Sequence, residues 1–181
     1  MAEPPLAVAM GDPAGIGPEV IAKAWDARDT AGLAPFFAVG DARAIEGVWQ
    51  GPVARVTSAA EAADRFSSAL PVMVIEDAGE IIPGVPDAEG ARCALHSLEV
   101  AAGFARSGAA AALVTGPVSK RQLYDIGFIH PGQTEFVAER CGIAPENTVM
   151  MLAGPTLRVV PVTTHIPLAA VPQAISIELI I

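Results

Sequence analysis

Short apolar runs alternate with helical patterns along the first 130 residues of the chain. The runs predict four strands, at residues 6–10, 36–39, 72–76 and 110–115. Between them, the spacing of apolar positions predicts helices, the longest of them over residues 88–107. This alternation is typical of a parallel sheet with helices on both faces. We therefore expect a doubly wound three-layer α/β/α fold, with the fully apolar run 110–115 as a central strand.

Capping residues predict where several helices begin. Asp41 directly follows the second strand and is placed to cap the next helix. Ser58 and Glu61 have the spacing of a capping box. Pro18 suits the first position of a helix over residues 18–28.

The pattern changes near residue 130. Residues 134–141 predict a short helix, and residues 148–153 and 157–164 predict an antiparallel hairpin that turns at Gly154-Pro155. We therefore expect an α/β domain over 1–130 and the start of a second subdomain over 131–181. The segment 171–181 begins like a helix and stops on apolar residues without a C-cap. We expect the chain to be truncated there or completed by a partner.

Composition narrows the class of protein. The chain has 181 residues, a net charge of −9 and 52% hydrophobic residues, of which few are aromatic. Such a chain buries ample apolar surface, which excludes disorder, and its acidic balance argues against nucleic acid or an anionic membrane as partner. Prolines interrupt the longest uncharged stretch, and two cysteines suit a reducing compartment. We therefore expect a cytoplasmic protein with no membrane span and no signal peptide.

Two glycine-containing segments follow predicted strands. Residues 11–19 read GDPAGIGPE, whose glycine spacing differs from the dinucleotide-binding G-x-G-x-x-G pattern. The segment is either an anion-binding turn at a helix start or a plain strand-to-helix connection. Residues 114–120 read VTGPVSK and place Thr115, Ser119 and Lys120 at the carboxyl end of a strand. Ligands of open α/β sheets bind at that edge, although Lys120 could equally be a solvated surface side chain.

Two further segments carry polar residues suited to ligands. Thr134, in GQTE, is either a helix N-cap or a hydroxyl presented to an anion. His165, in TTHIPL, is either a ligand of a divalent metal or a hydrogen-bonded structural histidine. His96 and His130 lie in no comparable pattern. Motifs typical of zinc sites, redox dithiols and serine hydrolases do not occur in the sequence.

Together, GDPAGIGPE (11–19), VTGPVSK (114–120), PGQTEFVAE (131–139) and TTHIPL (163–168) resemble the 4-hydroxythreonine-4-phosphate dehydrogenase family of vitamin B6 biosynthesis. All four segments match in order and spacing. The family is related in fold to the isocitrate and isopropylmalate dehydrogenases, which bind NAD(P) without the usual glycine fingerprint. Its members are about twice as long as this chain, which then corresponds to an N-terminal portion.

The resemblance implies NAD(P)-dependent oxidation of 4-phosphohydroxy-L-threonine, followed by loss of carbon dioxide to give 3-amino-2-oxopropyl phosphate, a step toward pyridoxal phosphate. It also implies a divalent metal (Zn, Mg or Co), because a cation stabilises the developing alkoxide and then the enolate-like charge. The family holds this metal with three histidines that both subunits of a homodimer contribute.

The resemblance assigns three residues of this chain. His165 matches the first metal histidine, and Thr134 matches a substrate-binding threonine. The preceding position, usually histidine in the family, is here Gln133, which can donate a hydrogen bond to phosphate or carboxylate but cannot become cationic. No residue is assigned to catalysis or to the nucleotide. The resemblance implies that the family's other two metal histidines, three further substrate-binding residues and most of its nucleotide site lie beyond residue 181.

Two alternatives stay open at this stage. The chain could be a dehydrogenase of a related threonate-type phosphate. It could also be a catalytically silent α/β fragment, or a binding module that retains only part of a phosphate site.

Overall fold

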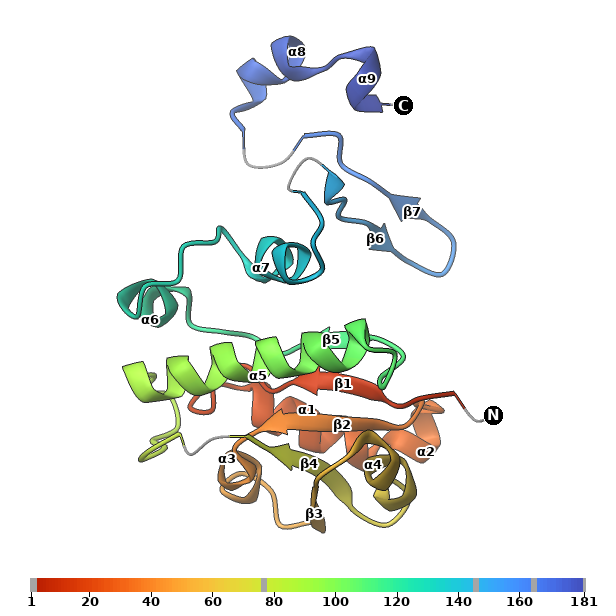
Figure 1. Ribbon diagram of the computed structural model, residues 1–181, viewed down its shortest axis with the longest axis vertical. Helices are drawn as coiled ribbons and strands as arrows, with labels where there is room; N and C mark the ends of the chain where they lie inside the picture. Colours follow the sequence, from red (N-terminus) through yellow and green to blue (C-terminus); the bar gives the residue numbers. More distant parts are fainter. Residues whose placement is uncertain (1–2, 76–77, 145–146, 164–165, 181) are drawn as a thin grey trace.

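The computed structural model describes residues 3–75, 78–144, 147–163 and 166–180 (Figure 1). Its main sheet has five strands in the order β3-β4-β2-β1-β5, and every neighbouring pair is parallel. The strands are β1 (Leu6–Ala9), β2 (Phe36–Gly40), β3 (Val53–Val56), β4 (Leu70–Val74) and β5 (Leu113–Thr115). The helices that accompany them are α1 (Gly17–Asp26), α2 (Arg28–Ala31), α3 (Ala42–Glu46), α4 (Ala59–Arg65) and α5 (Ala88–Arg106).

The sheet has a separate apolar core on each face. Alternate side chains of β1 and β2 point to opposite faces, as the strand period requires. Ala7, Ala9, Phe37 and Val39 belong to one core, together with residues of α4 and α5. Val8, Met10, Phe36 and Ala38 belong to the other, together with residues of α1 and α3. The predicted three-layer α/β/α fold is therefore confirmed.

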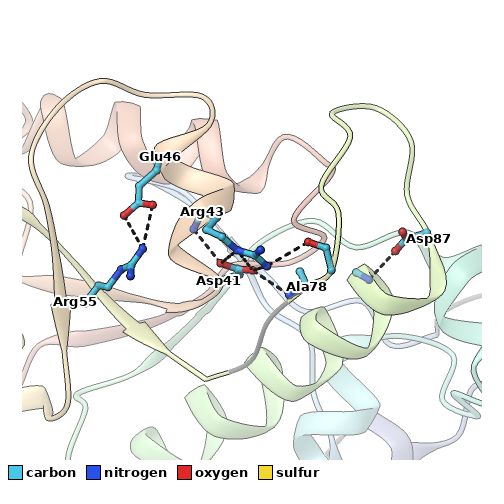
Figure 2. Close-up of polar contacts among 8 residues, drawn as sticks. Asp41, Arg43, Glu46, Arg55, Ala78 and Asp87 are labelled. Carbon is cyan, nitrogen blue, oxygen red and sulfur yellow. Dashed lines mark hydrogen bonds and ion pairs between the residues drawn. The ribbon is translucent and has the colours of Figure 1, made fainter.

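The predicted N-caps Asp41 and Ser58 are also confirmed, whereas the Glu61 carboxylate accepts from the Thr57 N–H and not from the Ser58 N–H of a capping box. The carboxylate of Asp41 accepts a hydrogen bond from the Arg43 N–H at the start of α3, and the Ser58 hydroxyl accepts one from the Glu61 N–H at the start of α4. Asp41 reaches further, since it also accepts from the Ala78 N–H and forms an ion pair with the Arg43 side chain (Figure 2). It thereby joins α3 to the segment that follows β4.

One expectation for the sheet was wrong, and one strand was not predicted. The apolar run 110–115 forms a strand only over its last three residues, and β5 lies at an edge of the sheet with Val114 43% exposed. Among the described residues, β5 pairs with β1 alone, so a central position in the sheet does not explain why the run is apolar. β3 was not predicted, because its short V-A-R-V sequence contains a charged residue and lies at the opposite edge.

The chain beyond β5 continues through α6 (Lys120–Asp125) and α7 (Gln133–Arg140). The predicted hairpin is confirmed in a shorter form, with β6 (Leu152–Ala153) antiparallel to β7 (Arg158–Val159). The predicted helix over 171–181 is instead two short helices, α8 (Val171–Ala174) and α9 (Ile177–Ile180), because Ile175 adopts an extended conformation. A 3₁₀ turn, η2 (Leu168–Ala170), precedes them.

The segment after α7 extends away from the sheet (Figure 1). Many of its large apolar side chains are exposed, among them Leu152, Leu157, Leu168 and Ile177. The division into two domains near residue 131 stays a prediction. None of the described helices is both long and apolar enough to cross a bilayer.

Candidate functional site

A cavity of about 680 Å³ lies at the carboxyl end of β5. Its wall includes Thr115 at the end of the strand, Lys120 at the start of α6, and Gln133 and Thr134 at the start of α7. The structure therefore brings together the candidate residues of two segments that the sequence separates. Apolar side chains close the rest of the wall, among them Phe128, Val149 and Leu179. Sequence reasoning missed these apolar residues, because nothing local distinguishes them from core positions.

Backbone contacts between two loops fix the segment between Thr115 and Val118, two residues that line the cavity. The Gly116 N–H donates to the Ala9 carbonyl at 2.7 Å, and the Asp12 N–H donates to the Pro117 carbonyl at 3.0 Å. A Cβ atom on Gly116 would come within 3.0 Å of Met10 backbone atoms. Gly116 is therefore needed for close packing, which gives the GDPAGIGPE loop a structural role as the partner of VTGPVSK.

Asp12 lies where these two loops contact each other. Its carboxyl group is buried, and its Oδ1 accepts a hydrogen bond from the Ala14 N–H. Burial raises the pKa of Asp12, and the nearby charge of Asp87 adds to that rise, against the lowering effect of the Ala14 hydrogen bond. Asp12 does not line the large cavity. Its geometry is that of a turn-stabilising residue.

Helix α7 begins without a side-chain cap. Its N-cap residue is Gly132, so of the two roles considered for Thr134 the helix N-cap is excluded. Thr134 lies in the first turn and is exposed. The first N–H groups of an α-helix have no partner within the helix and carry the positive end of its dipole. The cavity wall at α7 is therefore suited to an anion, with the Thr134 hydroxyl beside those N–H groups.

Gln133 is held by a hydrogen bond to the segment that follows β5. Its Nε2 donates to the Gly116 carbonyl at 3.2 Å, and the side chain is half-buried. Because Gly116 is itself bonded to β1, the start of α7 is tied to the main sheet. This bond occupies one of the two N–H groups through which Gln133 could bind a ligand.

Two charged side chains of opposite sign reach the cavity. Lys120 is exposed and forms no ion pair with any residue that the structure describes. Glu135, in the first turn of α7, lines the same wall. A cation and a carboxylate in one cavity suit a ligand that carries both a negative and a positive group.

The candidate metal ligand His165 lies outside the described residues. Across the described ranges, no three His, Cys, Asp or Glu side chains gather as a metal site would require. The Nε2 of His130 lies 3.6 Å from Glu139 Oε2, and its ring packs against Phe128 and Phe136. These contacts pack His130 between two aromatic rings of the described chain.

Comparisons with known proteins show which family the chain belongs to. The family model described as "Pyridoxal phosphate biosynthetic protein PdxA" matches residues 33–181. The 4-hydroxythreonine-4-phosphate dehydrogenase of Zymomonas mobilis is 51% identical over 98% of this chain and 53% of its own length. The protein of that name from Erythrobacter litoralis is 50% identical over 100% of this chain and 56% of its own length. This chain belongs to the PdxA family.

Solved PdxA structures share the fold as well. The crystal structure of a 4-hydroxythreonine-4-phosphate dehydrogenase from Burkholderia phymatum superposes with a TM-score of 0.82 at 30% identity, over 99% of this chain and 56% of the other. The PdxA chain described here thus spans about half the length of the curated relatives that it matches.

Proposed function

We propose that the complete protein is a 4-hydroxythreonine-4-phosphate dehydrogenase of pyridoxal phosphate biosynthesis. It would oxidise 4-phosphohydroxy-L-threonine with NAD or NADP and release carbon dioxide, to give 3-amino-2-oxopropyl phosphate. The observation that carries the proposal is the anion-binding geometry of the cavity, with an uncapped α7, the Thr134 hydroxyl and Lys120 on one wall, in a member of the PdxA family.

Each of these residues has a role in holding the substrate. Lys120 and the first N–H groups of α7 would bind the phosphate, since both favour a dianion. Thr134 would donate its hydroxyl hydrogen to the same group. Gln133 would contribute its second N–H or its Oε1, because its first N–H is bonded to Gly116. Glu135 would favour the substrate's ammonium group.

We further propose His165 as the metal ligand that this chain contributes to a homodimer. The described residues do not form a ligand set by themselves. The remaining ligands would come from the rest of the polypeptide and from the partner subunit. Three further points stay predictions: that the metal is Zn, Mg or Co, that the nucleotide is NAD or NADP, and that the protein is cytoplasmic.

The proposal is tested by adding NAD or NADP, 4-phosphohydroxy-L-threonine and Mg²⁺ or Zn²⁺ to the full-length protein. We expect the reduced nucleotide to form together with carbon dioxide. The absence of both products with either nucleotide would contradict the proposal. A higher rate with a phosphorylated threonate would instead support the related dehydrogenase, and inactivity of the 181-residue chain beside an active full-length protein would identify the chain as a silent fragment.

A further inference from the structure

The C-terminal end of α7 is fixed to α5 by a network of charged groups. Arg140, the last residue of α7, donates from Nε to Glu99 Oε1 at 2.8 Å and from Nη2 to Glu99 Oε2 at 3.3 Å. From the same face of α5, Arg106 donates to the Arg140 carbonyl at 2.6 Å. The Arg140 guanidinium also lies 4.4 Å from the centre of the Phe136 ring, which is buried in the core.

Helix α5 is itself fixed to the sheet. The Ser97 hydroxyl is fully buried, donates to the Val39 carbonyl at 2.6 Å and accepts from the Met10 N–H at 3.0 Å. These two backbone groups lie at the carboxyl ends of β2 and β1, the edge of the sheet that faces the cavity. Glu99 is two residues beyond Ser97 on the same helix. A continuous set of bonds therefore runs from the sheet through α5 to the end of α7.

The two ends of α7 have different roles. Its start carries Gln133 and Thr134 into the cavity, and its end carries Arg140 onto α5. An α-helix rises about 1.5 Å per residue and is stiff over so short a length, so the two ends move together. At the start, the described side-chain bond to the sheet is the single one from Gln133 to Gly116. The orientation of the anion-binding N–H groups therefore depends on the packing of Phe136 in the core and on the polar contacts at Arg140.

We propose that Arg140 is a positioning residue that, through Glu99 and Arg106, sets the orientation of the ligand-binding start of α7. This proposal takes only the identity of the ligand, a phosphorylated substrate, from the proposed function. A planar guanidinium suits it, because two parallel hydrogen bonds to one carboxylate fix a direction that a single bond leaves free. Arg140 does not touch the cavity and takes no part in the chemistry.

The test compares Arg140→Met with a matched control in the full-length protein. The control is Arg55→Met, because Arg55 Nη2 binds both oxygens of Glu46 at 3.1 Å on the opposite edge of the sheet (Figure 2). We expect Arg140→Met to raise KM for the phosphorylated substrate about fivefold with kcat nearly unchanged. Arg140→Lys, which keeps the charge but not the paired bonds, should have an intermediate KM. Arg55→Met should have the KM of the wild type.

A double-mutant cycle of Arg140→Met and Glu99→Gln measures how far the effect on KM depends on the contact between these two side chains. If the two side chains act together, adding Glu99→Gln to Arg140→Met should raise KM no further. Unchanged KM in Arg140→Met, an equal rise in Arg55→Met, or a kcat that falls while KM does not would each overturn the positioning role.

Two readouts separate this inference from the proposed function. Hydrogen exchange of the amides of residues 133–140 should be faster in Arg140→Met than in Arg55→Met, whatever the substrate is. If the wild-type protein oxidises no 4-phosphohydroxy-L-threonine, the same variants are compared by calorimetric titration with inorganic phosphate. We then expect Arg140→Met to raise the Kd for phosphate about fivefold. Equal exchange rates and equal affinities would reject the role of Arg140, even where the dehydrogenase activity is established.

Discussion

The side-chain amide of Gln133 donates to the carbonyl of Gly116 at 3.2 Å and joins the start of α7 to the end of β5. Gly116 is in turn bonded to Ala9 of β1, so this one bond connects the candidate ligand-binding helix to the main sheet. The bond has a close counterpart in the same chain, because Gln122 Nε2 donates to the Pro86 carbonyl at 2.9 Å, away from the cavity.

Replacing Gln133 with Leu should reduce both stability and affinity. We expect a loss of about 1 kcal/mol in the free energy of unfolding, since the Gly116 carbonyl loses its donor, together with a rise in KM. Gln122→Leu should show a comparable loss of stability with an unchanged KM. Urea unfolding and steady-state kinetics of both variants check this, and equal KM values for the two would remove Gln133 from the site.

Thr134→Val should weaken substrate binding without destabilising the fold. The reason is that Gly132, not Thr134, is the N-cap of α7, so the hydroxyl is free to serve a ligand. Ser58→Ala is the contrasting variant, because Ser58 caps α4 and should lose about 1 kcal/mol of stability. A Thr134→Val protein that unfolds more easily and keeps the wild-type KM would show a structural role instead.

Lys120→Met should lower the affinity for the phosphorylated substrate and make that affinity less dependent on salt. The charge of Lys120 acts through solvent at the cavity wall, so ions screen its attraction to phosphate. Lys23→Met serves as control, because Lys23 forms an exposed ion pair with Glu19 within α1. The measurement is KM at low and high NaCl, and a salt dependence that matches the wild type would assign Lys120 to the solvated surface.

Asp41→Asn should remove a part of the pH dependence of stability. Burial raises the pKa of Asp41, but hydrogen bonds from the Arg43 side chain and from the Ala78 and Arg43 N–H groups outweigh it and hold the pKa below its ordinary value of 3.8. A carboxyl group of this kind stabilises the folded state above its unfolded pKa, and the contribution is lost as the pH falls through the lower folded value.

We therefore expect Asp41→Asn to be less stable than the wild type by about 1–3 kcal/mol at neutral pH. The difference should shrink as the pH falls below about 4. Urea unfolding across that range measures it. A difference that stays constant on acidification would mean that the charge of Asp41 contributes nothing and that its contacts are those of a neutral acceptor.

His165→Ala should lower the divalent-metal content of the full-length protein without unfolding it. An imidazole nitrogen is a strong ligand for such ions, and its loss leaves the proposed site incomplete. Metal analysis after dialysis, together with circular dichroism, checks the prediction. Equal metal content in variant and wild type would return His165 to a structural role.

The local elements were largely predictable from the chain itself. Helix α5 and the caps at Asp41 and Ser58 depend on interactions between residues a few positions apart. Sequence periodicity and capping patterns predict interactions over that separation. The failures have one physical origin. The apolar run at β5 does not reveal whether another strand pairs beside it. Threonine is a common N-cap residue, but α7 has its N-cap at Gly132, two residues before Thr134.

By itself, the sequence determined that this protein is an α/β/α member of the PdxA family and that Gln133 and Thr134 open a helix. Only the tertiary structure decided that Gln133 is bonded to Gly116, that Lys120 shares its cavity, and that Arg140 fixes the far end of the helix to Glu99. The reason is that helix and strand patterns report interactions within a few residues. Contacts between distant residues, such as that of Arg140 with Glu99, depend on how whole elements pack.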